Sequence, residues 1–369
     1  MKIQADVYRI DEATERIQKL SDNLNGGGAT NEATSYIAFT KCDDMIWKAK
    51  VLLQDINNKG NYKMSFKPHK AITKYLSSLE MLGDVLFEGG EKPLPAPTHV
   101  FEVEKHVLHN VKMAADKRIC NISGICKLAT GEFLLVDNYN LKIKLLENNY
   151  EVISTCNVAE HPQDVCLIGE REVAVTVNKN SEDRHEIHFY HVRSGTLLKS
   201  RSIKLQHECV GLAHNSGTLY ITTDTSLHVY NISRGQGRLL YSDQIGEYTV
   251  HRCAVSPDGS RIFITDCTNH QLITPNKDGT KLSTFTHPEM LYPRCVSVTL
   301  LGHVFVSCQE SNTVIQVVVM NDGTQTVTPL AGKEKGITEP TVLYFNGSTN
   351  TLVVSMFEND NIVELRLKH

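Results

Sequence analysis

A group of three histidines is the first candidate for metal chemistry in this chain. His185, His188 and His191 lie within one short segment, and imidazole is a common ligand of zinc and other transition metals. The segment is typical of a β-strand, in which residues three apart point to opposite faces. His188 therefore cannot join His185 and His191 around one ion, and we expect hydrogen-bonded or solvent-facing histidines here.

The cysteines form no recognisable metal-binding or disulfide pattern. All ten are scattered and no Cys-x-x-Cys pair occurs, whereas zinc domains place their ligands in close pairs. Reduced thiols buried in strands explain this spacing. The sequence has neither an apolar signal core after Met1 nor a run of about 18 apolar residues. We therefore expect a cytoplasmic location, no membrane contact, no metal and no cofactor.

The charge balance does not favour a nucleic-acid partner. The formal net charge is -4 at pH 7, and residues 98–369 account for all of it, with 25 Lys and Arg against 29 Asp and Glu. Phosphate backbones attract basic surfaces, and the densest basic run, Lys199–Lys204, is expected to be a solvated strand edge. RNA binding stays an alternative, because a basic face can exist on a domain of acidic composition.

The elements that would carry these residues recur along the chain. A short apolar strand appears six times at a spacing of 40 to 48 residues, a period typical of propellers and other repeat folds. A further strand begins about ten residues after each copy begins, and Gly-containing turns separate the units. Four short antiparallel strands fit such a unit, and four strands make one propeller blade. The six copies are Phe133–Val136, Val173–Thr176, Leu219–Thr222, Ile262–Thr265, Val304–Ser307 and Leu352–Ser355.

The last unit predicts how the ring closes. Residues 341–369 have room for only three strands. Residues 98–113 are extended in character and precede the first full unit, so a strand from this segment can complete the last blade. Such a composite blade would join the two ends of the ring and cover a sheet edge. We therefore predict a six-bladed propeller over residues 98–369.

The central channel is where propeller enzymes such as lactonases and amidating lyases bind calcium or zinc, through ligands from several blades. Only one of the residues at the corresponding position of each unit is a carboxylate, whereas hard cations need several oxygen ligands. These residues are Gly124, Asp164, Val210, Cys253, Cys295 and Thr341. We expect a packed channel, with a metal-dependent propeller hydrolase or lyase as the second alternative.

The residues before the propeller are helical in character. Apolar spacings of three and four over Ile3–Leu24 predict a coiled-coil helix, and a second helix is expected over Glu32–Ile56. Residues 61–97 are expected to hold a short helix, Pro68–Leu82, and a linker rich in Gly and Pro. Because so short a coiled coil is marginally stable alone, we expect a homodimer through residues 1–60, with a local helical core as the alternative.

Four units join their two strands through an Asn-containing link that precedes an aliphatic residue, and this pattern resembles the Asp…Asn…Ile signature of NHL repeats. The units at 162–208 and 209–252 depart from it. Two longer stretches resemble invertebrate tripartite-motif (TRIM)-like proteins. Lys63–Pro68 and the residues up to Gly83 are similar to their segment between coiled coil and propeller, and Cys120–Leu146 is similar to their first blade. The four links are Asp137–Ile143, Asp266–Leu272, Glu310–Val314 and Glu358–Ile362.

This resemblance implies a recognition role for the chain, but it does not extend to the catalytic part of TRIM proteins. TRIM proteins combine a RING domain and zinc-binding B-boxes with a coiled coil and a recognition domain. No cluster of paired Cys and His precedes residue 95. We therefore expect a partial gene product or a form without the catalytic half, with ubiquitin-ligase activity only if a RING domain lies upstream.

We predict a mainly β protein with a six-bladed NHL-like β-propeller, preceded by a short α-helical coiled-coil region. It is expected to act as a non-enzymatic protein-recognition module that binds a protein partner on one propeller face, with no catalytic residue. Loops held by rigid blades suit binding, and Tyr and Arg are favoured at the centres of interfaces. Blade-to-blade packing is the alternative role of these residues. The candidate contact residues are Tyr139, His161, Tyr248, His251, Arg252, Tyr292 and Arg294.

Overall fold

The computed structural model divides the chain into two compact units, Met1–Pro95 and Ala96–His369. In the first unit, β1 (Lys63–Pro68) pairs antiparallel with β2 (Gly83–Glu88), a strand pair that the sequence did not predict. The expected coiled coil over residues 1–60 lies outside the described residues, as does the expected helix Pro68–Leu82 after its first residue. The structure describes residues 63–68, 83–88, 100–179, 184–193, 195–243, 246–256, 259, 261–299, 302–319, 325–347 and 349–368.

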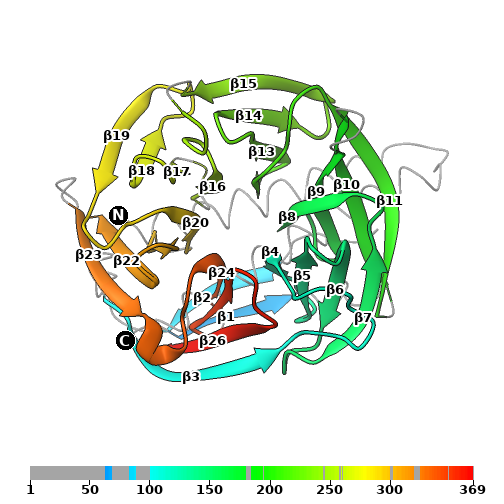
Figure 1. The fold of residues 1–369 in the computed structure, drawn as a ribbon, viewed down its shortest axis with the longest axis horizontal. Helices are drawn as coiled ribbons and strands as arrows, with labels where there is room; N and C mark the ends of the chain where they lie inside the picture. The colour runs from blue at the N-terminus through cyan, green and yellow to red at the C-terminus, as the bar shows by residue number, and fades with distance from the viewer. Residues whose placement is uncertain are drawn as a thin grey trace. The chain divides into compact units, whose positions relative to one another are not determined.

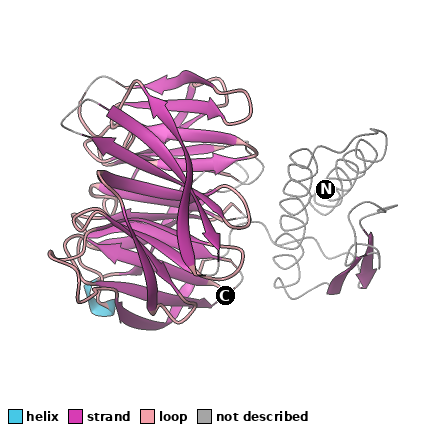
Figure 2. Cartoon of the chain, turned by 90° about the vertical axis from the view of Figure 1, so that its right-hand side faces the viewer, coloured by secondary structure: helices cyan, strands magenta, loops and turns pink. Residues whose placement is uncertain are grey.

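The second unit is a six-bladed β-propeller, which confirms the predicted architecture. Six four-stranded antiparallel sheets form a ring (Figure 1), and each innermost strand contacts the innermost strands of both neighbouring blades. In the side view the described part of this unit consists of strands and loops, with one short helical turn, η3 (Lys333–Lys335), drawn in cyan (Figure 2). None of the helices in the described residues is long and apolar enough to cross a membrane.

The strands of each blade have a fixed order from the axis outward. The inner strands are β4 (Ile122–Lys127), β8 (His161–Leu167), β12 (Leu212–Asn215), β16 (Arg252–Val255), β20 (Pro293–Val298) and β24 (Pro340–Asn346). The second strands are β5 (Phe133–Asp137), β9 (Glu172–Lys179), β13 (Thr218–Thr222), β17 (Ile262–Asp266), β21 (Val304–Cys308) and β25 (Thr351–Met356).

The other two strands of each blade complete its outer half. The third strands are β6 (Lys142–Leu146), β10 (Arg184–Arg193), β14 (Ser226–Asn231), β18 (Gln271–Pro275), β22 (Thr313–Val319) and β26 (Asn361–Lys368). The outer strands are β7 (Val152–Asn157), β11 (Thr196–Leu205), β15 (Gln236–Ser242), β19 (Lys281–Thr286), β23 (Gln325–Ala331) and β3 (Glu102–Asn110). The six repeated apolar segments of the sequence are thus the six second strands.

Burial explains why those segments are apolar on both faces. A second strand lies in the middle of its sheet with a neighbouring blade against each face, so every residue of β5, β17 and β21 is buried. The outer strand β7 instead alternates between exposed and half-buried residues, because only one of its faces packs against a neighbouring blade. The repeat therefore comes from strands that lie in the buried middle of each blade.

A hydroxyl at the end of the second strand joins neighbouring blades. In blade 3, Thr222 Oγ1 accepts a hydrogen bond from the backbone N–H of Gly211 and donates to the carbonyl of His251 in blade 4. In blade 5, Ser307 Oγ does the same between the N–H of Cys295 and the carbonyl of Thr341. Each hydroxyl satisfies a donor of its own inner strand and an acceptor of the next, which leaves neither group unpaired in the core. Thr176, Thr265 and Ser355 also donate to an inner-strand carbonyl of the following blade.

The sixth blade is composite. β3 precedes the first full blade in the chain, yet it pairs antiparallel with β26 along the outside of the last sheet. The link after β3 is then tied to blades 6 and 1. Asp360 accepts a hydrogen bond from the backbone N–H of Cys120 at 2.8 Å and forms an ion pair with Lys112 at 2.9 Å. The outer edge of β26 is therefore covered by β3, although the two strands lie at opposite ends of the propeller sequence.

Candidate functional site

All seven candidate contact residues lie on one side of the propeller. Successive strands of a blade run in opposite directions, so the start of each inner strand and the loop between the second and third strands share a side. We name this side the entry face. Tyr139 lies in the loop between β5 and β6, and the others lie in the links that lead into inner strands or at the first residues of those strands. These are His161, Tyr248, His251, Arg252, Tyr292 and Arg294.

Arg252 is buried and, together with Asp164, joins four blades. Its guanidinium forms an ion pair with Asp164 of blade 2 through Nη1, and Nη2 donates to the carbonyls of Ser123 in blade 1 and Gln163 in blade 2, at 2.9 and 3.0 Å. The other side of the Asp164 carboxylate group accepts from the N–H of Val165, and Oδ2 accepts from the N–H of Leu212 in blade 3 at 2.9 Å. Arg252 is thus committed to internal contacts and is not available to a ligand on the surface.

The residues that face the channel in blades 3 and 4 are one position away from those predicted. Arg252 pairs with Thr265 and Gly211 bonds to Thr222, whereas the repeat spacing had indicated Cys253 and Val210. A Cβ at Gly211 would meet Arg252 Cδ at 2.9 Å, so glycine is needed for the arginine to pass. Relative to blades 1, 2 and 5, the spacing between paired residues of the inner and second strands is one residue shorter in blade 3 and one residue longer in blade 4, which a fixed offset cannot detect.

This contact set does not suit a metal in the channel. Asp164 is the one carboxylate among the predicted channel residues, and a guanidinium already neutralises its charge. Cys253 packs with the apolar side chains between blades 3 and 4. A hard cation needs several oxygen ligands at short distance, and Arg252 takes the place where such an ion would have to sit beside Asp164.

The buried His251 pairs with the half-buried Asp224 next to Arg252. His251 Nδ1 lies 2.7 Å from Asp224 Oδ1. Burial, followed by the positive charges of Arg294 and Arg252, holds the pKa of His251 well below its usual range. Burial also raises the pKa of Asp224 to about 6, against the opposing charges of the two arginines. A neutral imidazole that donates from Nδ1 to the carboxylate is the arrangement that these shifts favour at neutral pH.

Two tyrosines and Arg294 border this pair. The Tyr248 ring lies edge-on to the His251 ring at 5.9 Å and is 38% exposed, and the Arg294 guanidinium lies 5.8 Å from the centre of the Tyr292 ring. Tyr248 and Tyr292 both adopt left-handed backbone conformations, with φ of 59° and 53°. Such conformations are uncommon for aromatic residues and are typical of functional loops. Four candidate residues therefore meet at the start of β16 and β20.

The remaining two candidates lie elsewhere on the entry face. The Tyr139 hydroxyl donates to Glu358 Oε1 at 3.0 Å, which links the loops of blades 1 and 6. His161 is exposed at the first residue of β8. The sequence missed Asp224, because it lies in a unit without the repeated Asp…Asn link and no pattern singles it out.

Exposed glutamates surround the Arg294 sector of the entry face. They lie in links and loops of blades 4, 5 and 6, and we name them the acidic rim: Glu247, Glu310, Glu339 and Glu358. Over the same arc the described lysines are Lys112, Lys333 and Lys335, of which Lys112 is paired with Asp360 and Lys335 with Glu334. The edge of the entry face around Arg294 is therefore negative, and the unpaired positive charge of Arg294 lies nearer the axis.

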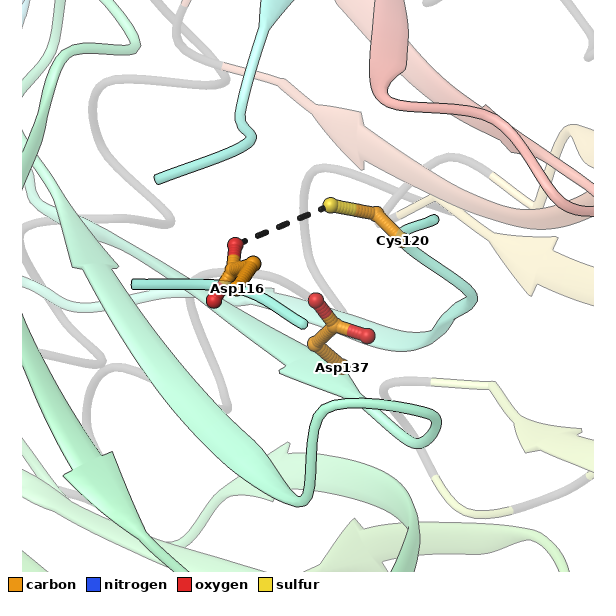
Figure 3. A group of neighbouring side chains, drawn as sticks. All are labelled: Asp116, Cys120 and Asp137. Atoms are coloured by element: carbon orange, nitrogen blue, oxygen red, sulfur yellow. Dashed lines mark hydrogen bonds between the residues drawn. The ribbon is translucent and has the colours of Figure 1, made fainter. Parts of the chain in front are cut away.

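A second group of possible metal ligands is occupied by a lysine. Asp116, Cys120 and Asp137 point toward one another in blade 1 (Figure 3). The fully buried Lys144 ammonium contacts Asp116 at 2.7 Å, Asp137 at 2.8 Å and Cys120 Sγ at 3.2 Å. Burial raises the pKa of the Cys120 thiol to about 12, so it stays protonated. The group is an internal ion-pair network in which Lys144 is the cation.

The three histidines of β10 bind different partners, in line with the expected strand geometry. His185 Nδ1 lies 3.0 Å from Asn178 Oδ1, His188 Nε2 lies 2.9 Å from Glu186, and His191 Nε2 lies 3.8 Å from Glu172. Neither His185 nor His191 shares its partner with His188. Each histidine is explained by a local polar contact.

No protein-family model matches the sequence, and no curated protein matches it. Several solved structures resemble this one. An auxiliary nutrient binding protein from Bacteroides thetaiotaomicron is 13% identical, with a TM-score of 0.57 over 72% of this chain and 77% of that chain. A protein of unknown function from the same organism is 11% identical, with a TM-score of 0.56 over 78% and 80%. A luciferin-regenerating enzyme is 11% identical, with a TM-score of 0.53 over 71% and 95%. At these identities the likeness shows a shared fold alone.

Proposed function

We propose that this chain is a cytoplasmic, non-enzymatic recognition module of the TRIM-like type, whose NHL-type propeller binds a protein partner on its entry face. The observation that carries the proposal is the group of Tyr248, Tyr292 and Arg294 at the start of β16 and β20. Tyrosine and arginine supply most of the binding energy in many protein interfaces. Here they are held in place by the ends of rigid inner strands, so little side-chain entropy is lost on binding.

The internal charges support binding rather than metal-assisted catalysis. The buried carboxylates that could hold a cation, Asp164 in the channel and Asp116 with Asp137 in blade 1, already face Arg252 and Lys144. Their contacts stabilise the ring. Ubiquitin-ligase activity is not part of this proposal, because it would belong to a RING domain.

The acidic rim favours a protein partner with basic side chains over RNA. Four exposed glutamates border the tyrosine and arginine group. Opposite charges at the edge of an interface raise the association rate and orient the partner, whereas a phosphate backbone would meet repulsion there. A homodimer through residues 1–60 would present two entry faces and raise the apparent affinity without any new contact.

The test is affinity capture with the full chain from a lysate, with and without RNase. Tyr248→Asn removes the exposed ring and keeps a residue that tolerates the left-handed backbone. Arg234→Ala, in the exposed turn between β14 and β15 on the opposite side, is the matched control. We expect RNase-resistant protein partners that Tyr248→Asn loses and Arg234→Ala retains. Capture of RNA, with partners lost on RNase treatment, would replace the proposal with RNA binding.

A further inference from the structure

We propose that the entry face binds a single carboxylate group of its partner at Arg294, between Tyr248, His251 and Tyr292. This inference rests on the proposed function and names the chemistry of its central contact. The ligand group is an acidic side chain or a chain-terminal carboxylate within an otherwise basic peptide segment. The argument depends on which charges near the channel mouth are already neutralised.

The two arginines at this end of the channel differ in their partners. Arg252 is buried, paired with Asp164 and bonded to two carbonyls. Arg294 is only half-buried and forms no ion pair with any residue that the structure describes; its guanidinium lies over the Tyr292 ring. A cation held over an aromatic ring, and not ion-paired with a carboxylate among the described residues, is a ready donor for an incoming anion.

His251 provides a complementary group beside this cation. Its Nδ1 is committed to Asp224 at 2.7 Å. Nε2 has no hydrogen-bond partner in the described residues and is not among their fully buried unsatisfied atoms, so it keeps a small accessible area although the side chain as a whole is only 5% exposed. A neutral imidazole offers an acceptor there. A hydrogen-bond acceptor close to a cation suits a peptide, in which carboxylates and backbone N–H donors lie side by side.

The charge pattern selects a carboxylate over a phosphate. One unpaired guanidinium matches one negative charge, whereas phosphate sites use clusters of cations against about two charges. The carboxylate group of Asp224 is near enough for Arg294 to oppose the rise in its pKa. A dianion would meet both this group and the acidic rim. A carboxylate flanked by basic residues satisfies the centre and the rim together.

The test follows the arginine side-chain Nε–Hε signals of the full chain by NMR during titration with acetate, with inorganic phosphate and with chloride as separate probes. Arg294→Gln assigns the signal of interest. Arg118→Gln is the matched control, since Arg118 is an exposed arginine on the same face. We expect a saturable shift of the Arg294 signal with acetate, which Arg118→Gln leaves unchanged.

A second arm uses two acetylated peptide amides of five residues, with Lys at both ends and either Glu or Gln at the centre. We expect the Glu peptide to bind roughly tenfold more tightly, the size of one charge-assisted hydrogen bond, and Arg294→Gln to abolish the difference. Equal binding of the two peptides, a shift that survives Arg294→Gln, or saturation with phosphate but not acetate would each overturn the inference. Because no cellular partner is needed, these outcomes are independent of the capture experiment.

Discussion

Asp224 Oδ1 lies 2.7 Å from His251 Nδ1. Burial raises the pKa of Asp224 and lowers the pKa of His251, so both shifts favour the uncharged form of the residue. The two residues together therefore differ from an ordinary surface ion pair. The carboxyl group gains protons more readily than usual and the imidazole loses its proton more readily than usual. The pair links the loop between β13 and β14 to the first residues of blade 4, directly beside Arg252.

This pair predicts a defined dependence of stability on pH. Because the pKa of His251 is lowered in the folded protein, its contribution is present above pH 6.5, the usual value, and is lost as pH falls. Asp224 has the opposite sign, since a raised pKa contributes below its usual value and is lost as pH rises through about 6. The neighbouring charges are Arg252 and Arg294 from β16 and β20, with Tyr248 and Tyr292 uncharged. We expect His251→Gln to lose less stability than wild type between pH 7 and pH 5 in urea unfolding. An identical pH profile for both proteins would contradict the assignment.

Asp164→Asn is expected to destabilise the propeller strongly. It leaves the Arg252 guanidinium buried without its counter-charge, and breaking a buried pair from one side costs about 3–5 kcal/mol. The double variant Asp164→Asn with Arg252→Met should recover part of the loss, because both charges are then absent. Urea unfolding of the two single variants and the double variant completes a thermodynamic cycle. A near-zero coupling would mean that the pair does not join the blades.

Lys144→Met should be more damaging at neutral than at acidic pH. Burial alone would raise the pKa of Asp116, but hydrogen bonds from Lys142 and Lys144 lower it to about 2. A carboxyl with a lowered pKa contributes stability above its usual value of 3.8, and that contribution is lost as pH falls. We expect a loss of about 3–5 kcal/mol at pH 7 that shrinks as pH falls below 3.8 toward about 2. Lys105→Met, at an exposed position of β3, is the control and should be nearly neutral at both pH values.

Thr222→Val tests the hydroxyl bridge between blades 3 and 4. The substitution keeps the side-chain shape but leaves the N–H of Gly211 and the carbonyl of His251 without their partner. Loss of a buried partner costs about 1–3 kcal/mol. Thr196→Val, at the exposed first residue of β11, is the matched control and should change stability by less than about 0.5 kcal/mol. Equal unfolding midpoints for the two variants would show that the bridge does not stabilise the ring.

The repeat was predictable because it reflects the most constrained strand of each blade. Phe133–Asp137 and its five equivalents lie in the middle of their sheets and are mostly buried, so their apolar character is visible in the sequence without any knowledge of contacts. The pair Asp164 and Arg252 could not be found in this way, because the two residues are 88 positions apart and meet only when blades 2 and 4 face each other across the axis. The one-residue shift of blades 3 and 4 hid Arg252 from a fixed spacing. The pair β1 and β2 escaped for a different reason, since the sequence predicted only a helix over Pro68–Leu82 and a linker in this region.

The contact residues were predicted by type and location rather than by geometry. Tyr248, His251, Tyr292 and Arg294 were chosen because they precede inner strands, and the structure brings these four together. Arg252 satisfied the same criterion but is buried, because its side chain turns into the channel toward Asp164. Whether a side chain at a strand start turns inward or outward depends on the small residue opposite, here Gly211, and that relation is not local in the sequence.

The composite sixth blade has a consequence for the synthesis of the protein. β3 leaves the ribosome long before its partner β26, and the hydrogen bond between Asn110 and Asn361 spans 251 positions of the chain. During translation, blades 1 to 5 can form in order, but the edge that β3 will cover does not yet exist. Closing so long a loop is slow, and unpaired strands are prone to associate with other chains. The final strand is therefore the step at which a nascent chain becomes a ring, and a ribosome that stalls before β26 releases an open arc with an unprotected strand at each end.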